Sequence, residues 1–308
     1  MSLPDVVVLG DANPDLVLRG DVVPRFGQAE QLLDGADLVL GGSAAIVACG
    51  LARLGVNTAL VGTVGADLFG DFIREQLDAA AVDTRWLSTH PHEPTGLTVV
   101  LSRDDRAILT HLGAMAAFDV TLVDQDLLAG ARHVHAASFF LQPGLAAGLP
   151  AVFETVQRSG ATTSLDTNWD PSEKWSGVQE VLPFVDVLLP NAAELFAITG
   201  SATENEAARR ITAFGTSVAL KAGAAGGTVW TPDGGHWTSP GPAVDVVDTT
   251  GAGDSFDAGY IAALIEGRSP WECLDRAVVC GSMSTRAAGG TAAQATRDEV
   301  DAAIGSRL

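Results

Sequence analysis

The most informative stretch of the sequence is Asp248-Thr249-Thr250-Gly251-Ala252-Gly253-Asp254-Ser255-Phe256. It follows an extended stretch expected over residues 243–247 and precedes an apolar helix expected over 256–265. The small residues let the backbone approach an anion closely, and successive N–H groups can form an oxyanion cradle. A helix starting here adds the positive end of its dipole. The stretch therefore predicts a site where a phosphate is stabilised, although a plain glycine-rich turn with Asp254 as a favourable helix-start residue also fits.

Length and composition predict one large α/β domain without nucleic-acid or membrane partners. The chain has 308 residues, 47% of them apolar, which is enough for a substantial core. Its formal charge of −20 repels phosphodiester backbones and anionic lipids. No apolar run is long enough to cross a bilayer.

Cysteine usage and the first residues favour a cytoplasmic protein. Cys49, Cys273 and Cys280 are odd in number and form no C-x-x-C pair, which is typical of reduced thiols. Residues 1–5 carry no basic region of the kind that leads into a signal peptide. We therefore expect a cytoplasmic location.

Strand and helix patterns alternate along most of the chain. Strands are expected over 6–9, 58–64, 133–137, 163–166, 185–189 and 217–221, and helices over 43–54, 69–80, 145–158 and 192–198. This alternation predicts a mainly parallel sheet covered by helices on both faces. The fold class is therefore α/β, with three layers.

Two segments break the alternation. Residues 13–40 and 95–112 contain strand patterns with polar turns and little helix, and Thr98–Leu101 and Ala107–Leu109 flank the polar turn 103–106 like a hairpin. They predict a small β-sheet that projects from the main domain as a lid over a ligand or another subunit. Arg103 and Arg106 could reach a substrate from it, or be solvated. We count residues 1–308 as one domain.

The stretch 248–256, a nonapeptide, resembles a known protein family when it is taken together with a second motif. Gly41-Gly42-Ser43-Ala44-Ala45 leads into Leu51-Ala52-Arg53-Leu54-Gly55, about two hundred residues upstream of the first motif. Together they resemble the two signatures of the ribokinase-like (PfkB) carbohydrate kinases, with Asp254 at the place of the catalytic base. The resemblance runs from Gly10 to about Gly290 and implies a ribokinase-like sandwich and an ATP-dependent kinase acting on a sugar or similar small molecule.

The resemblance also implies a set of substrate-binding residues. Asp11, Asn13 and Asp15 match the family's sugar-hydroxyl binders, and short carboxylate and amide side chains suit a polyol. Turn chemistry at Asn-Pro-Asp is the simpler explanation of the same residues. The paired glycines Gly41 and Gly42 would let the backbone contact a polyol, while Ser43 can cap the following helix. Gln142 lies near the place of an acidic sugar ligand in some relatives.

Further residues match the family's nucleotide and metal elements. Asn191-Ala192-Ala193-Glu194 resembles its N-x-x-E element, in which Glu194 would hold Mg²⁺ through water and Asn191 would support the phosphate. The same residues also read as a helix-capping box. Lys221, Gly223 and Gly226 match the family's nucleotide loop, and the resemblance makes Thr249 a further nucleotide-binding residue. Asp248 matches a position near which relatives of the family bind K⁺. Asp166-Thr167-Asn168 matches a family element that lies near the path of the phosphate.

The implied reaction is in-line transfer from ATP, with the backbone of Gly251, Ala252 and Gly253 stabilising the moving group and Asp254 accepting the hydroxyl proton. One departure from the family affects the acceptor, because Ile46 stands where an asparagine is usual. The reaction class is unaffected, but ribose in its usual pose is put in doubt. The resemblance further implies a homodimer formed through the lid.

Rival functions fit the sequence less well. A nucleotide-dependent dehydrogenase needs G-x-G-x-x-G after the first strand, which Gly10-Asp11-Ala12-Asn13 does not supply. A P-loop kinase needs Gly-Lys before Ser or Thr, which neither Lys174 nor Lys221 has. A nucleoside kinase of the same fold, with Phe139 or Phe140 against the base, and a non-catalytic sugar-binding regulator remain as alternatives.

Overall fold

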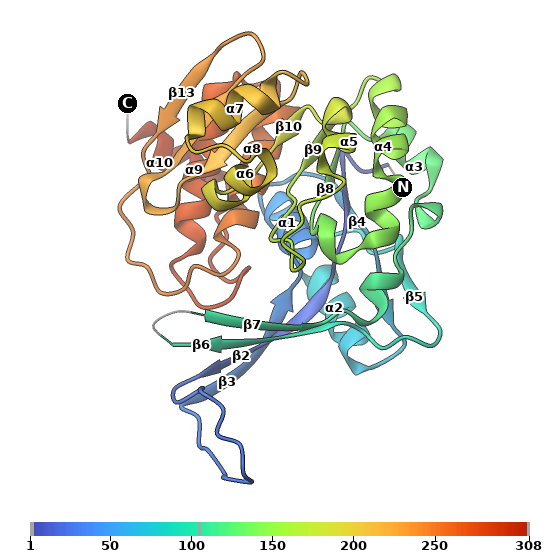
Figure 1. Cartoon of the computed structure of the whole chain (residues 1–308), viewed down its shortest axis with the longest axis vertical. Helices are drawn as coiled ribbons and strands as arrows, with labels where there is room; N and C mark the ends of the chain where they lie inside the picture. Colours follow the sequence, from blue (N-terminus) through green and yellow to red (C-terminus); the bar gives the residue numbers. More distant parts are fainter. Residues whose placement is uncertain (1–2, 104–105, 307–308) are drawn as a thin grey trace.

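A nine-stranded sheet forms the centre of the molecule (Figure 1). The computed structural model describes residues 3–103 and 106–306. Along the sheet the strands run in the order β13 (His236–Ser239), β12 (Gly227–Trp230), β11 (Ser217–Lys221), β10 (Val187–Leu188), β9 (Thr162–Leu165), β8 (His133–Ala136), β1 (Val6–Leu9), β4 (Thr58–Gly65) and β5 (Leu87–His90). Every neighbouring pair from β11 to β5 is parallel, and β12 and β13 add an antiparallel edge.

Helices cover both faces of this sheet, as predicted. One face packs on α3 (Gln125–Gly130), α4 (Pro143–Arg158), α5 (Val178–Val181), α6 (Ala192–Thr199) and α7 (Glu204–Thr212). The other packs on α1 (Ser43–Arg53), α2 (Leu68–Ala79), α8 (Ala252–Ile265), α9 (Pro270–Ser284) and α10 (Arg297–Gly305). Short 3₁₀ turns lie at 113–117, 120–122, 139–141, 182–184 and 223–225.

Strand β1 shows why the sheet has two covered faces. Its four residues are all fully buried, with Val7 and Leu9 in the core on one face and Val6 and Val8 in the core on the other. Such continuous apolar strands are typical of parallel sheets that lie between helical layers. Because the strands from β11 to β5 are parallel, their carboxyl ends lie at one edge of the sheet, where α/β proteins usually bind ligands.

The two segments that break the alternation form a separate four-stranded sheet, which we call the small sheet. Its strands follow the order β3 (Gly35–Gly41), β2 (Asn13–Arg19), β6 (Leu97–Ser102) and β7 (Arg106–His111). The β6–β7 pair is the predicted hairpin, and its turn residues 104 and 105 lie outside the described part of the chain. The small sheet projects below the main body in Figure 1.

Two local expectations were wrong. Helix α8 begins at Ala252 and not at Phe256, so the small residues of the nonapeptide form its first turn. Gly42, with a φ of 85°, is the N-cap of α1, and Ser43 gives it no side-chain cap because its hydroxyl bonds elsewhere.

No helix in the described parts of the chain has the length and apolar character that would let it cross a membrane.

Candidate active site

A cavity of about 700 Å³ lies between the small sheet and the carboxyl edge of the large one. We call it the acceptor cavity. The small sheet supplies Asn13, Asp15, Thr98, Val100, Arg106, Ile108 and Thr110, and the loop after β1 supplies Asp11. Helices and loops of the main body supply Gly42, Ser43, Ile46, Ser138, Leu141, Asn168, Trp169, Glu194, Thr249, Thr250, Gly251 and Asp254, among others. Residues from seven separate parts of the sequence therefore share one cavity.

The floor of the acceptor cavity carries ordered hydrogen-bonding groups. Both carboxylate oxygens of Asp11 accept backbone N–H groups at the start of α1, from Ser43 at 3.2 Å and Ala44 at 3.0 Å. The amide nitrogen of Asn13 donates to Asp15 Oδ1 at 3.0 Å and to Thr98 Oγ1 at 3.1 Å. These bonds fix the side chains in place, so the floor is a rigid set of acceptors and donors suited to a polyol.

Burial raises the pKa of the floor carboxyls. The pKa of Asp15 is raised to about 7 by burial and by the neighbouring charge of Asp11, and burial also raises the pKa of Asp11. Two carboxylates this close disfavour each other's ionisation. A ligand that donates hydroxyl hydrogens would stabilise their charged forms.

Asp254 lies in the first turn of α8 and faces the acceptor cavity. Its Oδ1 accepts a hydrogen bond of 2.5 Å from the hydroxyl of Ser43, which in turn accepts one from Asn168 Nδ2 at 3.3 Å. Burial raises the pKa of Asp254 to about 7, against the lowering effects of Ser43 and Lys221. A carboxyl group with this pKa can take up or release a proton near neutral pH.

Lys221 is held between two buried carboxyl groups next to Asp254. Its Nζ lies 2.6 Å from Asp166 Oδ2 and 2.9 Å from Asp257 Oδ2. Burial would lower the pKa of Lys221, but Asp166, Asp257 and Glu194 raise it above its usual value. Burial raises the pKa of Asp257 well above normal. Burial also acts to raise the pKa of Asp166, but the charge of Lys221 and the hydrogen bonds to Asp166 together lower it. The Lys221 ammonium is therefore paired with the Asp166 carboxylate, while burial disfavours the charged form of Asp257.

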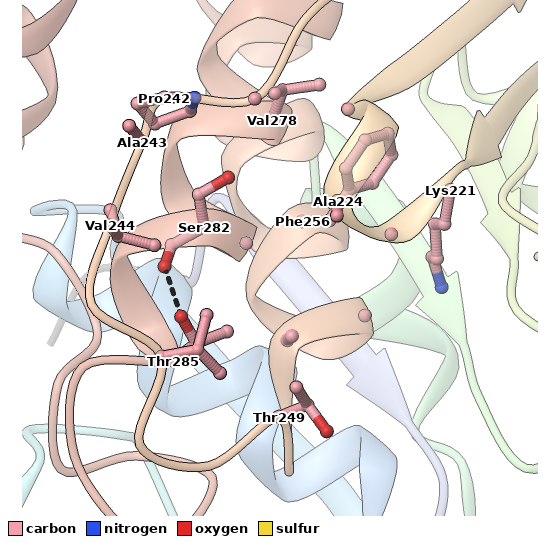
Figure 2. Close-up of a pocket in the computed structure, with 17 residues that line it drawn as sticks. Lys221, Ala224, Pro242, Ala243, Val244, Thr249, Phe256, Val278, Ser282 and Thr285 are labelled. Atoms are coloured by element: carbon pink, nitrogen blue, oxygen red, sulfur yellow. Dashed lines mark hydrogen bonds between the residues drawn. The ribbon is translucent and has the colours of Figure 1, made fainter.

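A second cavity, of about 540 Å³, lies on the other side of the start of α8; we call it the nucleotide cavity. Figure 2 shows Pro242, Ala243, Val244 and Val278 along its apolar wall, with Lys221 and Thr249 at its polar end. Gly223 and Gly226 form its loop, and Thr249 lines both cavities. The apolar wall suits an aromatic base, and the polar end suits phosphates.

Asn191 and Glu194 form the predicted capping box at the start of α6. The Asn191 side chain accepts from Glu194 N at 3.0 Å, and Glu194 Oε2 accepts from Asn191 N at 2.9 Å. Glu194 also lines the acceptor cavity, and its pKa is raised to about 7 by burial and by Asp166. The capping role leaves Oε1 of Glu194 outside the box, so a second role for this carboxyl is compatible with the first.

Asp248 ties the nonapeptide to the loop before α10. Its Oδ1 accepts from the backbone and hydroxyl of Thr250, at 2.9 and 2.8 Å, and its Oδ2 accepts from Gly289 N at 2.9 Å. These bonds outweigh burial and lower its pKa. Asp248 is therefore an ionised group that fixes the backbone just ahead of the glycines.

Two of the residues predicted to bind substrate do not line the acceptor cavity. Gln142 is fully buried, and its amide nitrogen donates to the carbonyls of Ala137 and Ser138 at 3.1 and 3.3 Å. A Cβ on Gly41 would stand 2.0 Å from Asp15 Oδ1, so this glycine makes room for Asp15. Gln142 and Gly41 therefore shape the structure around the acceptor cavity without lining it.

Sequence reasoning missed Thr98, Thr110, Ser138 and Leu141, which line the acceptor cavity. The alternation of side chains along β6 and β7 could have indicated Thr98 and Thr110, because every second residue of a strand faces the same side. Ser138 had no such signal. Its φ is 55°, and its backbone N–H donates to Asn168 Oδ1 at 2.8 Å.

The chain is similar to a protein family and to several known proteins. The family model of the pfkB family carbohydrate kinases matches residues 3–297. An ATP-dependent ribose-1-phosphate kinase from Halopiger xanaduensis is 34% identical over 98% of this chain and 99% of its own length. Arabidopsis thaliana ribokinase, in a structure complexed with ribose and ATP, superposes with a TM-score of 0.88 at 28% identity, over 98% of each chain.

Two further solved structures contain metal ions. A fructokinase from Vibrio cholerae, with fructose, ADP and potassium bound, has a TM-score of 0.83 at 25% identity, over 98% of each chain. A ribokinase-like protein from E. coli, in complex with ATP and Mg²⁺, shares the fold with a TM-score of 0.88 at 24% identity, over 99% of this chain and 100% of its own.

Proposed function

Since this chain belongs to the pfkB family of carbohydrate kinases and is an ATP-dependent sugar kinase, we propose that Asp254 is its general base and that its acceptor is a pentose. The observation that carries the proposal is the position of Asp254. Its carboxyl group faces the acceptor cavity, while Thr249, five residues earlier, lines both cavities. A phosphoryl group passing from one cavity to the other would pass the start of α8.

The proposed reaction is a direct in-line transfer. The acceptor oxygen forms a bond to the γ-phosphorus of ATP, the bond from that phosphorus to the β,γ-bridging oxygen breaks, and ADP leaves. The hydroxyl proton goes to an Asp254 carboxylate oxygen. A carboxylate suffices as base because the loose transition state of phosphoryl transfer requires little early deprotonation. Ser43 holds the carboxylate in place through its hydrogen bond to Oδ1.

The backbone at the start of α8 would hold the moving phosphoryl group. Gly251, Ala252 and Gly253 lie at the N-terminus of this 14-residue helix, where the first N–H groups have no partner within the helix. These amides and the helix dipole favour a negative charge. Gly251 has a φ of 71°, and a Cβ there would meet Gly290 Cα at 2.6 Å, so the turn requires glycine.

Glu194 fits a role in holding Mg²⁺. Glu194 is 6% exposed, and burial together with the neighbouring Asp166 and Asp254 raises its pKa. The three carboxyl groups are an excess of negative charge, which a divalent cation would balance. Mg²⁺ usually keeps several waters, so contact through water is the form we propose. When bound, the ion would neutralise charge on the β- and γ-phosphates. K⁺ near Asp248 is a further element of the proposal.

The acceptor proposal rests on the cavity floor and on the relatives. Asp11, Asn13 and Asp15 offer fixed partners for neighbouring hydroxyls. Ile46 lines the cavity where the resemblance leads us to expect asparagine, so one polar contact is replaced by an apolar one. Ribose 1-phosphate and ribose are the first acceptors to test, because a relative 34% identical is a ribose-1-phosphate kinase. Trp169 is half-exposed in the cavity wall, so nucleosides belong in the same panel.

We further propose that the whole chain acts as one kinase domain with the small sheet as its lid. The face of the small sheet turned away from the cavity carries Leu16, Leu38, Val99 and Leu109 in one row of paired positions across four strands. Leu38 and Leu109 are 41% and 58% exposed. This apolar row supports a homodimer formed through the small sheet. The cytoplasm, where ATP is available, is the location we propose.

The test is the variant Asp254→Asn, measured by ADP formation with pentoses, pentose phosphates and nucleosides. Loss of a general base lowers kcat by roughly 10²- to 10⁴-fold, and we expect little change in KM for ATP. Asp298→Asn is the matched control, because Asp298 also lies in the first turn of a helix but is exposed and far along the chain. Near-normal turnover by Asp254→Asn would contradict the proposal.

A further inference from the structure

Arg106, on strand β7 of the small sheet, contacts the segment that leads into the phosphate cradle. Its guanidinium donates to Thr250 Oγ1 at 2.6 Å and to Thr249 Oγ1 at 3.0 Å, and it lies 3.8 Å from Asp248 Oδ1. These contacts join residues more than 140 positions apart in the sequence. A cation from the small sheet is therefore placed next to Gly251, where the cradle begins.

The two cavities contain very little other positive charge. In the described part of the chain, Arg106 is the only cationic side chain that lines the acceptor cavity, and Lys221 is the only one that lines the nucleotide cavity. Lys221 is held at 2.6 and 2.9 Å by Asp166 and Asp257, so much of its charge is balanced within the protein. A transferring phosphoryl group needs positive charge around its equatorial oxygens.

The Arg106 side chain is more exposed than that of Lys221. Among its contacts are the hydroxyls of Thr249 and Thr250 and an ion pair of 3.8 Å with Asp248. Its side chain is 34% exposed, so the guanidinium remains accessible from the cavity. Guanidinium groups bind phosphate oxygens through two parallel N–H bonds.

We propose that Arg106 binds the phosphoryl group during its transfer and so makes the small sheet a part of the catalytic machinery. The inference rests on the proposed function, because it assumes that transfer occurs past Thr249 and the cradle. The N–H groups of Arg106 would contact the equatorial oxygens of the transferring phosphoryl group. At the same time the acceptor oxygen bonds to phosphorus, the bond from phosphorus to ADP breaks, and Asp254 takes the hydroxyl proton. Because Arg106 is carried by the sheet that covers the acceptor, this charge is supplied when the cavity is closed.

The experiment compares Arg106→Gln, Arg106→Lys and Arg106→Gly with Arg103→Gln in the full-length enzyme. Arg103 lies on the same hairpin and does not line either cavity, so Arg103→Gln removes the same charge away from the site. We expect Arg106→Gln to lower kcat roughly 10²- to 10³-fold, as loss of one charge-stabilising donor does elsewhere. KM for ATP and for the acceptor should stay close to the wild-type values. The kcat of Arg106→Lys should lie between those of the wild type and Arg106→Gln.

Chemical rescue separates this role from a structural one. Guanidinium chloride, far below denaturing concentrations, should restore part of the kcat of Arg106→Gly, and potassium chloride at equal ionic strength should not. Thermal unfolding of each variant shows whether it is folded; β7 is an exposed edge strand, so folding should be retained.

Three results would overturn the inference. One is a wild-type kcat in Arg106→Gln. Another is a rise in KM confined to phosphorylated acceptors, which would assign Arg106 to acceptor binding. The third is a loss of kcat that guanidinium does not rescue and that Arg103→Gln shares. If the wild-type enzyme transferred phosphate to no sugar or nucleoside, the proposed function would fail, and not the role of Arg106 alone.

Discussion

At the scale of single residues, the protonation of Asp254 is set by its neighbours. Burial raises its pKa to about 7, Asp166 and Asp11 add to the rise, and Ser43 and Lys221 oppose it. A base is active only when it is unprotonated. The rate should therefore be low below the pKa and rise as pH increases through it.

This gives a prediction for the pH profile. We expect kcat/KM for the acceptor, which reports ionisations of the free enzyme, to rise with pH through about 7 and then level off. In Ser43→Ala the hydrogen bond that favours the carboxylate is lost, so the midpoint should move up by about one pH unit. That size follows because a bond to a charged group is worth roughly 1.5 kcal/mol, or about one pKa unit.

Asp15 and Glu194 also have pKa values raised to about 7, so they need a control. Ser43 influences Asp254 and neither of these groups. Asp15→Asn should therefore weaken acceptor binding without moving the midpoint as Ser43→Ala does. A midpoint that follows Asp15→Asn and ignores Ser43→Ala would assign the ionisation to the cavity floor.

At the scale of elements, the start of α8 depends on a glycine. Gly251 is the N-cap with a φ of 71°, and the backbone of Gly290 lies where its Cβ would be. Any side chain must push the loop before α10 away from the cradle. Asp248, which bonds to Gly289, would lose its geometry in the same movement.

We therefore expect Gly251→Ala to impair both folding and turnover. The left-handed φ alone costs about 1–2 kcal/mol for a residue with a Cβ, and the contact with Gly290 adds to this. Gly215→Ala is the matched control, because Gly215 has a φ of 91° but no atom within 4 Å of an added Cβ. Denaturant unfolding should show a smaller loss of stability for Gly215→Ala, with unchanged kcat.

Equal losses of stability in the two variants would show that the contact with Gly290 costs nothing. Normal kcat in a folded Gly251→Ala variant would show that the backbone there does not need its present position for phosphoryl transfer.

At the scale of the whole molecule, the small sheet has two different faces. Thr98, Val100, Ile108 and Thr110 face the acceptor cavity, and the residues between them face away from it. The outer face carries the apolar row that includes Leu38 and Leu109, so the same four strands can cover a substrate and bind a second copy of the chain.

We expect the wild-type protein to sediment at twice the 31.7 kDa mass of the chain, and Leu109→Asp to shift it toward the monomer. A carboxylate introduced on both sides of the interface would be buried without a partner, which costs several kcal/mol. Leu122→Asp is the control, since Leu122 is 48% exposed but lies outside the small sheet. Sedimentation velocity over a concentration series measures the shift, and a wild-type monomer or a dimeric Leu109→Asp would contradict this interface.

Local pattern in the sequence determined the alternating strands and helices, the projecting small sheet and the position of Asp254 in a first helical turn. These features depend on side-chain periodicity and on small residues, which act within a few positions of each other. Family resemblance added Asp11, Asn13, Asp15 and Glu194, and all four line one cavity.

Only the tertiary structure decided which side chains meet. Ser43 bonds to Asp254 across 211 positions, Lys221 lies between Asp166 and Asp257, and Gln142 turns into the core. Arg106 reaches Thr249 and Thr250 from another sheet. Such contacts depend on how the sheets and helices pack in three dimensions, and no periodicity along the chain encodes the distance between residues so far apart.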